Sequence, residues 1–235
     1  MTGLTLVVGR SQKEATLAIG GTWLTFSLAL FLALPQPPNP RHVALGVLAG
    51  AILVIVGFSA ASRCRPVFLR PNPQHGRLAV LSLLAGTALG AVLLGALLAL
   101  ANVEPSLHAR FAGRLSEPLW RPWALAFESS ILEEVTFRLF VMSVLAWIAA
   151  RFIKRPRIVL AIALIASALL FGLAHLPSWL SVARTSALIG SVLLLNGLGG
   201  LLLGWIFWRW GLAYAILCHL AGDVVIQSLG PRLLA

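Results

Sequence analysis

The sequence predicts an all-α fold, a polytopic bundle of about seven transmembrane helices, within a range of six to eight. Hydrophobic residues make up 59% of the 235 residues and charged residues only 11%, against about 45–50% and about 25% in soluble domains. With a mean hydropathy of +0.94, a water-soluble globule could not hide its apolar side chains. The charges form short clusters between apolar runs, which is typical of a multi-span membrane protein.

Seven apolar runs are long enough to cross a membrane, because a helix needs about 20 residues to span the apolar layer. In chain order they are 15–34, 43–62, 78–101, 123–150, 158–176, 185–208 and 211–230. The connection 102–122 is the longest polar segment, and we expect a short interfacial helix in it. We expect one membrane domain over 1–235, with spans one to three in 1–114 and a core formed by the later spans in 115–230.

The net charge of +11 is a signal of topology and does not indicate a nucleic-acid partner, because the cations do not share one surface. Cytoplasmic loops carry an excess of lysine and arginine. One side of the predicted bundle holds Arg10, Lys13, Arg63, Arg65, Arg70, Arg77, Arg151, Lys154, Arg155, Arg157 and Arg209; the other holds Arg41, Arg110, Arg114, Arg121, Arg184 and Arg232. We therefore expect the N-terminus in the cytoplasm and the C-terminus on the other side of the membrane. The lipid bilayer surrounds the predicted bundle and is its expected partner.

Pairs of glycines four residues apart occur in three of the predicted spans. They are Gly46 and Gly50, Gly86 and Gly90, and Gly200 and Gly204. Such spacing lets two helices approach closely. We interpret it as packing within one chain rather than as a dimer face, and the sequence leaves the oligomeric state open.

The functional signal lies in ionisable residues within the apolar runs, since such residues are costly in a bilayer and face a protein interior or a wet cavity. Four of the seven acidic residues are there, and so are two of the five histidines. They are Glu128, Glu133, Glu134, Asp223, His175 and His219. The sequence therefore predicts a polar site between the later helices, with Glu128 as a structural or solvated residue.

Helical spacing groups these residues into constellations. Glu134 and Arg138 are four residues apart with the acid first, the favoured order for an ion pair on one helix face. Glu133 points about 100° away from Glu134 and could reach a water as a general base. His219 and Asp223 share a helix face in the same way.

A zinc site is the alternative, because two histidines and two glutamates are suitable zinc ligands. An H-E-x-x-H motif is absent from the sequence, however, and Glu134 has a charged partner in reach. We therefore expect no cofactor and favour a metal-free water activated by Glu133 over zinc.

Three motifs in order resemble those of the CPBP family, which comprises CAAX proteases and bacteriocin-processing enzymes and is also called ABI. The segment 133–138 (EEVTFR) is similar to E-E-x-x-x-R, 171–175 (FGLAH) to F-x-x-x-H, and 219–223 (HLAGD) to H-x-x-x-N/D. The resemblance covers about 115–230, and spans one to three match only as generic membrane helices.

The resemblance implies an intramembrane endopeptidase of the glutamic type. By that resemblance Glu133 deprotonates a water and His175 helps to hold it. Glu134 and Arg138 support the site from behind.

The other two motifs supply the remaining roles that the resemblance implies. His219 and Asp223 stabilise the oxyanion of the tetrahedral intermediate, and Phe171 helps to position the substrate. Asp223 departs from the asparagine of the eukaryotic CAAX endopeptidase relatives. Because an ionised aspartate only accepts hydrogen bonds, Asp223 serves the oxyanion only if protonated and otherwise orients His219.

The family also implies the cell membrane of a prokaryote and a membrane-anchored protein or peptide as substrate. That substrate would be lipidated or C-terminally anchored, a signal-like peptide or a bacteriocin leader. A non-catalytic immunity or scaffold protein of the same family is the second hypothesis. A proton-coupled transporter is less favoured, because spans one to three carry no ionisable residue to form a relay.

Overall fold

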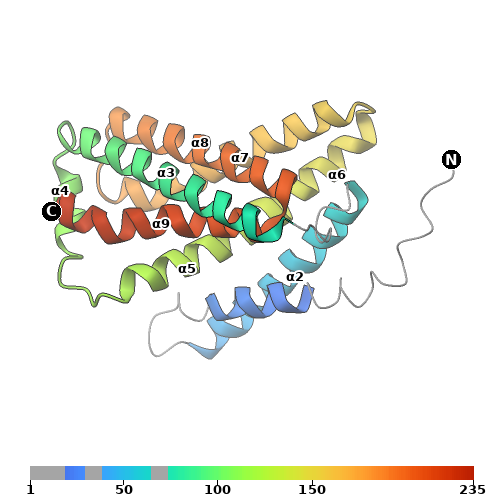
Figure 1. Cartoon of the computed structure of the whole chain (residues 1–235), viewed down its shortest axis with the longest axis horizontal. Helices are drawn as coiled ribbons and strands as arrows, with labels where there is room; N and C mark the ends of the chain where they lie inside the picture. Colours follow the sequence, from blue (N-terminus) through green and yellow to red (C-terminus); the bar gives the residue numbers. More distant parts are fainter. Residues whose placement is uncertain (1–18, 30–38, 65–73) are drawn as a thin grey trace.

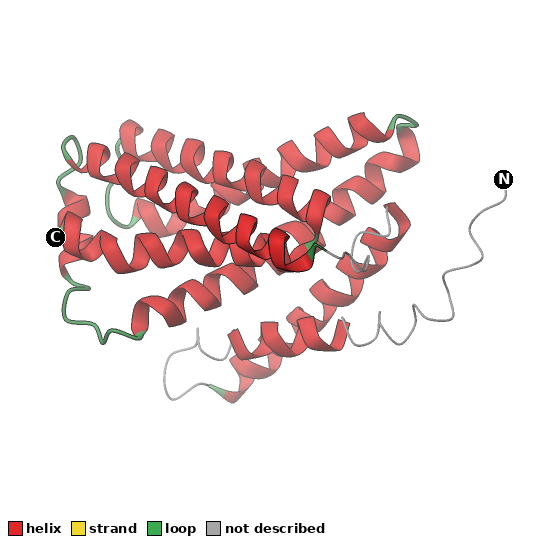
Figure 2. Ribbon diagram, viewed as in Figure 1, coloured by secondary structure: helices red, strands yellow, loops and turns green. Residues whose placement is uncertain are grey.

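The structure, a computed structural model, describes residues 19–29, 39–64 and 74–235 and contains helices but no strands within these ranges (Figure 2). Residues 19–29 are helical. The helices that follow are α2 Pro40–Cys64, α3 His75–Ala101, α4 Ser106–Ala112, α5 Arg121–Glu133, the π-helix η1 Glu134–Met142, α6 Ser143–Phe152, α7 Pro156–Leu180, α8 Ser186–Trp210 and α9 Leu212–Leu234.

Six helical segments in the described residues are long and apolar enough to cross a membrane. They are α2, α3, the continuous segment Arg121–Phe152, α7, α8 and α9. These spans coincide with predicted runs two to seven, and the structure describes the first run, 15–34, only over residues 19–29, which are helical. The predicted polytopic helical bundle is therefore confirmed, and the chain is an integral multi-pass membrane protein.

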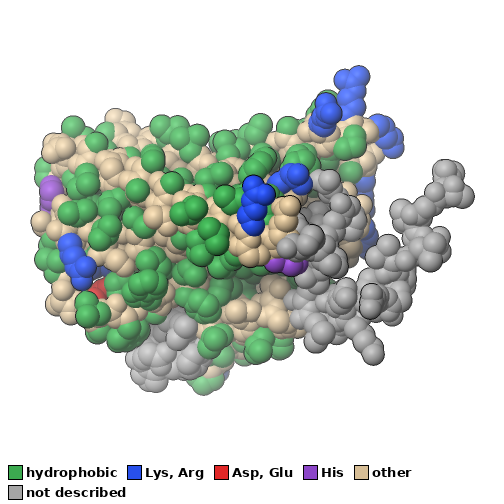
Figure 3. Space-filling view, in the orientation of Figure 1, with side chains coloured by type: hydrophobic (Ala, Val, Ile, Leu, Met, Phe, Trp, Pro, Cys, Tyr) green, Lys and Arg blue, Asp and Glu red, His purple; other side chains and the backbone are tan. Residues whose placement is uncertain are grey.

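The spans differ in what they contact. Figure 1 shows α3 beside α9, α7 beside α8, and α5 along α9, while α2 lies against η1 and α6 at the edge of the bundle. Apolar side chains are spread over the visible surface between the two ends of the molecule, as Figure 3 shows. Such a surface suits the lipid tails of a bilayer, where it need not be buried.

The third span contains an unusual backbone segment. Arg121–Phe152 runs as α-helix, then as the nine-residue π-helix η1, then as α-helix again. The π-helix is anchored from α7, where the Ser167 hydroxyl donates to the Phe137 carbonyl at 2.8 Å. Mid-helix π segments are rare and occur frequently at functional sites. The 3.6-residue period used to interpret the sequence did not predict this segment.

The connection between α3 and α5 contains α4, which confirms the expected short helix in 102–122. Glu104 fixes this connection to the start of α8: its carboxylate accepts hydrogen bonds from Ser106 Oγ at 2.6 Å and Thr185 Oγ1 at 2.7 Å. These two hydrogen bonds, that from Ser106 first, lower the pKa of Glu104. Thr185 also caps α8 by accepting from the backbone N–H of Leu188.

Two of the glycine pairs lie where helices cross within this chain. A Cβ at Gly86 or Gly90 of α3 would meet backbone atoms of Cys218 or Gly222 of α9. A Cβ at Gly200 of α8 would meet Ala168 of α7, and one at Gly204 would meet the Leu164 side chain of α7. Packing within one chain, as the sequence indicates, therefore accounts for these two pairs.

Candidate active site

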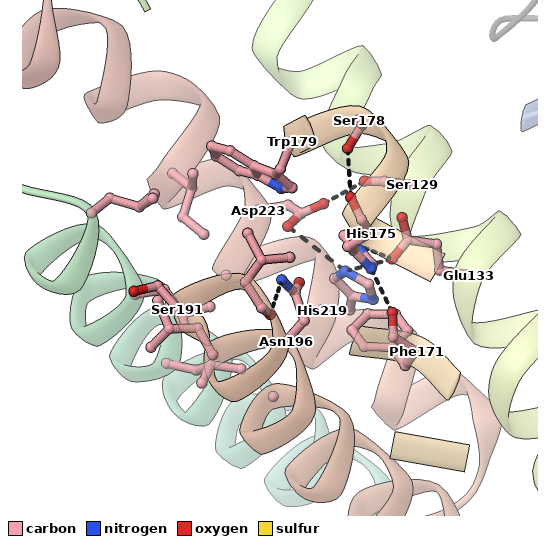
Figure 4. A pocket seen from close by; sticks show the side chains of 18 of the residues that line it. Ser129, Glu133, Phe171, His175, Ser178, Trp179, Ser191, Asn196, His219 and Asp223 are labelled. Atoms are coloured by element: carbon pink, nitrogen blue, oxygen red, sulfur yellow. Dashed lines mark hydrogen bonds and ion pairs between the residues drawn. The ribbon is translucent and has the colours of Figure 1, made fainter. Parts of the chain in front are cut away.

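The predicted site residues come together in the middle of the bundle from α5, η1, α7 and α9. Figure 4 shows Glu133, His175, His219 and Asp223 pointing toward one another around a cavity. That cavity has a volume of about 280 Å³. Its lining includes these four residues and Phe171, while Glu134 and Arg138 lie behind it, 0% and 1% exposed. Residues up to 90 positions apart in the sequence, from Glu133 to Asp223, thus form one polar cluster.

Glu134 forms the buried base of the cluster. One carboxylate oxygen, Oε2, pairs with Arg138 Nε at 3.2 Å, as the four-residue spacing predicts. The other oxygen, Oε1, accepts a hydrogen bond from His219 Nδ1 at 2.9 Å. Because Glu134 is an acceptor, Nδ1 of His219 carries a proton and its Nε2 points toward the cavity. Glu134 therefore links the arginine to one of the two site histidines.

Arg138 is unusual because its charge is almost completely buried. Apart from the Nε contact with Glu134, its Nη1 and Nη2 atoms have no hydrogen-bond partner in the part of the chain that the structure describes. The guanidinium lies instead over the Phe171 ring, 4.3 Å from the ring centroid. This cation–π contact is strengthened by the burial of the guanidinium.

Phe171 connects the charged base to both histidines. Its ring is 3% exposed and packs edge-on against Phe137, with centroids 5.2 Å apart. The centroid of the His175 ring lies 4.5 Å away and that of His219 6.1 Å away. The ring lines the cavity but is largely covered by these neighbours, so the geometry favours a role in holding the histidines. Contact with the substrate stays a prediction.

Glu133 faces the cavity with a carboxylate oxygen that is close to two imidazoles. Its Oε2 lies 3.6 Å from His175 Nε2 and 3.7 Å from His219 Nε2. Both distances exceed hydrogen-bond length, and within the described residues this oxygen has no hydrogen-bond partner. The three atoms thus surround a position where a single water could reach all of them.

His175 is held so that it presents an acceptor to that position. Its Nδ1 donates to the Phe171 carbonyl at 2.8 Å, since a carbonyl oxygen can only accept. The neutral ring then has a lone pair on Nε2, which faces Glu133. A water between the two would donate one proton to Glu133 and one to His175, leaving its own lone pair free.

Asp223 is fixed by a residue that the sequence interpretation missed. Its Oδ2 is hydrogen-bonded to the Ser129 hydroxyl of α5, while its Oδ1 lies 3.7 Å from His219 Nε2. Ser129 stands one helical turn before Glu133, and this spacing is the signal that could have identified it. His219 donates its direct hydrogen bond to Glu134 Oε1, and the role of Asp223 toward the oxyanion or toward His219 stays a prediction.

The cavity also has walls from two helices that carry none of the site residues predicted from the sequence. Helix α3 contributes Leu89, Leu93, Leu97 and Leu100, and α8 contributes Leu188, Ser191, Val192, Leu195, Asn196, Gly199 and Leu203. Asn196 is a single amide in an otherwise apolar run, which is a usable signal in the sequence. The result is a channel with largely apolar walls from α3 and α8 and with the polar cluster on the side of α5, α7 and α9.

The described residues contain no group of three or more histidine, cysteine, aspartate or glutamate side chains placed to hold a metal ion. Glu134 already binds Arg138 and His219 through its two oxygens. Glu133, His175 and His219 are the donors that remain closest to one another. A zinc ion would have to draw in these side chains from their present positions.

Comparison with protein families gives one match. Residues 115–225 match the model of a family described as type II CAAX prenyl endopeptidase Rce1-like. The matched range contains α5, η1, α6, α7 and α8 completely, together with the part of α9 that carries His219 and Asp223. No curated protein and no solved structure matches the chain.

Proposed function

Since the chain belongs, over residues 115–225, to the Rce1-like family of type II CAAX prenyl endopeptidases, a protease family, we propose that it is a glutamic-type intramembrane endopeptidase. It hydrolyses a peptide bond in a membrane-anchored protein or peptide, using a water activated by Glu133. The observation that carries this proposal is the position shared by Glu133 Oε2, His175 Nε2 and His219 Nε2 on the polar side of the channel.

The first step is proton removal from the bound water. Glu133 takes the proton as general base, and His175 holds the water through its Nε2 lone pair. The resulting hydroxide attacks the substrate carbonyl carbon, and the proton on Glu133 passes to the leaving amine. Both groups need only short movements because their side chains are already directed at the same position.

The second requirement is a donor for the negative oxygen of the tetrahedral intermediate. His219 can supply a proton from Nε2 when it is doubly protonated, since Glu134 accepts from its Nδ1 and stabilises the cation. Asp223, held by Ser129, adds a second anion beside this imidazole. In this proposal the carboxylates hold His219 as the oxyanion donor.

The channel indicates the kind of substrate. Its leucines from α3 and its apolar residues from α8 can accept an aliphatic segment of the substrate. A peptide bond next to that segment would then lie at the polar cluster. We propose a lipidated or C-terminally anchored protein in the cell membrane of a prokaryote. The N-terminus of the protease would lie in the cytoplasm, as the distribution of cations predicts.

Replacing Glu133 with alanine is expected to abolish cleavage while leaving the protein folded, because Glu133 makes no hydrogen bond through its inner oxygen. The chromosomal gene is deleted and replaced by a wild-type or a variant copy. Terminal proteomics then identifies the chain termini of the membrane proteins in each strain. The new chain termini that the wild-type protein produces should fall with Glu133→Ala to below about 1% of the wild-type level, because a general base contributes about 100-fold or more. Unchanged processing would reject the mechanism.

Glu128→Gln is the matched control for this experiment. Glu128 lies on the same helix and is half-buried, but it does not line the cavity. Processing should therefore continue in this variant at close to the wild-type level. Equal loss in both variants would show that any glutamate removed from α5 damages the protein, and the assignment of the base to Glu133 would fail.

Treatment with strong chelators is expected to leave processing intact, because the mechanism uses a water activated by a carboxylate. The measurement is cleavage of a dependent membrane substrate, identified in the preceding experiment, by purified protein before and after dialysis against a chelator. Loss of cleavage on chelation with recovery on addition of zinc would instead assign the water to a metal.

A further inference from the structure

Asn196 places a carboxamide near the middle of α8, where the wall of the cavity is otherwise mostly apolar. Its Nδ2 donates to the Val192 carbonyl of its own helix at 2.8 Å, which fixes the side chain. This bond uses one of the two N–H donors of the amide. Asn196 makes no other side-chain hydrogen bond within the described part of the chain, and Figure 4 shows the amide directed into the cavity. One N–H and Oδ1 are therefore available to a molecule that enters the cavity.

A carboxamide in a membrane-spanning helix commonly bonds to a neighbouring helix. The side chain of Asn196 does not do so within the described residues, although α8 packs closely against α7. Polar groups without partners are costly in apolar surroundings. This cost is offset when the substrate supplies the missing partner, so the amide has the properties of a group that acts on the substrate.

Asn196 lies at the depth of the catalytic cluster. A Cβ added to Gly172 of α7 would lie only 3.1 Å from the Leu193 carbonyl oxygen of α8. Asn196 is three residues further along α8, within the same helical turn. On α7, Phe171 directly precedes Gly172, and its ring packs beside that of His219, with centroids 6.1 Å apart. Asn196 and His219 thus reach the same section of the cavity from two different helices.

The tetrahedral intermediate needs hydrogen-bond donors for its negative oxygen, and the catalytic cluster supplies few. Its ionised carboxylates only accept. The Nδ1 proton of His175 is taken by a backbone carbonyl, and the single proton of the Ser129 hydroxyl is taken by Asp223 or by a carbonyl of its own helix. Arg138 lies behind the cavity and does not line it. Within the cluster this leaves Nε2 of His219 as the donor.

The other polar groups on the cavity wall lie at different depths or have acceptors already. Gln227 is eight residues beyond the site histidine of α9, which is about 12 Å of helix. Ser191 is five residues before Asn196, or about 8 Å. The Ser178 hydroxyl and the Arg110 guanidinium donate to backbone carbonyls near the end of α7. Among the described residues that line this cavity, Asn196 therefore has the free N–H that is closest in depth to the cluster.

From these observations we infer that Asn196 is a second oxyanion donor, a catalytic residue on a helix that carries none of the other catalytic side chains. The inference rests on the proposed function, whose reaction it completes. A neutral amide suits this position, because it stabilises the negative oxygen without adding a charge beside Glu133 and Asp223.

The donor acts in both halves of the reaction. As the hydroxide attacks, the π-electron pair of the substrate carbonyl moves onto its oxygen, which accepts from Nδ2 of Asn196 and Nε2 of His219. The pair returns to form the carbonyl of the product when the C–N bond breaks. The proton held by Glu133 then passes to the leaving nitrogen.

Asn196→Leu is expected to lower kcat about 100- to 1,000-fold, the effect of removing one oxyanion donor, with KM almost unchanged. The donor acts on the transition state, so its loss appears in kcat. Leucine resembles the other side chains on this wall, and the variant should unfold at the wild-type temperature or above it. The measurement is steady-state cleavage, by purified protein, of the membrane substrate identified in the Glu133 experiment. Asn196→Ala should show the same division between kcat and KM, and it replaces the leucine variant if that one does not fold.

Leu198→Ala is the matched control, because Leu198 lies on the same helix but is 53% exposed on its outer surface and does not line the cavity. Its kcat and KM should equal those of the wild type. A wild-type kcat in the Asn196 variants would overturn the inference. A rise in KM at unchanged kcat would overturn it as well, since Asn196 would then bind the substrate in its ground state. An equal loss of kcat in Leu198→Ala would show that any change in α8 slows the reaction.

This result can be distinguished from failure of the proposed function. The proposed function fails if processing persists in Glu133→Ala. The inference about Asn196 fails by itself if cleavage depends on Glu133 and the Asn196 variants still turn over at the wild-type rate.

Discussion

Replacing Arg138 with alanine is expected to destabilise the protein by about 3–5 kcal/mol, because the change leaves the Glu134 carboxylate as an uncompensated buried charge. Both side chains are essentially inaccessible, and their ion pair at 3.2 Å is the contact of Arg138 that neutralises Glu134. The loss also removes the cation from the Phe171 ring. Glu134→Ala should have a similar effect, and it also removes the hydrogen-bond acceptor of His219.

The measurement is thermal unfolding in detergent, followed by the yield of folded protein after purification. For a chain of this size a loss of this magnitude corresponds to a decrease of roughly 10 °C in the unfolding temperature. Arg151→Ala is the matched control, since it removes an exposed arginine that contacts the Trp147 ring. An unfolding temperature for Arg138→Ala equal to that of the wild type would contradict the pairing argument.

A double variant separates the loss of charge balance from the loss of volume. Glu134→Gln with Arg138→Met replaces the ion pair by neutral groups, and the glutamine carbonyl can still accept from His219. Removing both charges of a buried pair is often close to neutral for stability. The double variant should therefore recover most of the stability that Arg138→Ala loses, and failure to recover would assign the effect to packing alone.

The polar cluster could be predicted from the sequence because each member is an ionisable exception within an apolar run. The cost of placing charge in a bilayer makes every such residue informative, so Glu133, His175 and His219 stand out without a structure. The spacing also predicts the pairing of Glu134 with Arg138. It does so although the backbone there is a π-helix, because residues four apart remain on neighbouring parts of the wider turn.

Other parts of the site depend on contacts that a single sequence does not encode. Ser129 has a hydroxyl that also reaches the Leu125 carbonyl of its own helix, so in the sequence it resembles an ordinary serine in a membrane helix. Its second partner, Asp223, is 94 residues away. The apolar walls from α3 and α8 could not be predicted either, since a leucine that faces a cavity and one that faces lipid give the same hydropathy pattern in the sequence.

The position of α9, which carries both His219 and Asp223, depends on a close approach to α3. A Cβ added at Gly86 would lie 1.9 Å from the carbonyl oxygen of Cys218 and 2.7 Å from its carbonyl carbon. Both are backbone atoms, so no side-chain rotation relieves the clash and one helix must move away from the other. Because Cys218 directly precedes His219, the imidazole moves with it.

Gly86→Ala is therefore expected to reduce processing about 100-fold, the effect of displacing a catalytic group by about 1 Å, and to destabilise the protein by about 1–3 kcal/mol. Gly95→Ala on the same helix is the control, since a Cβ there meets no described atom within 4 Å. Because alanine has a higher helix propensity than glycine, the Gly95→Ala variant should be as stable as the wild type or slightly more stable. Terminal proteomics and thermal unfolding of both variants provide the measurements. Equal behaviour of the two alanine variants would mean that contact between α3 and α9 does not position the catalytic imidazole.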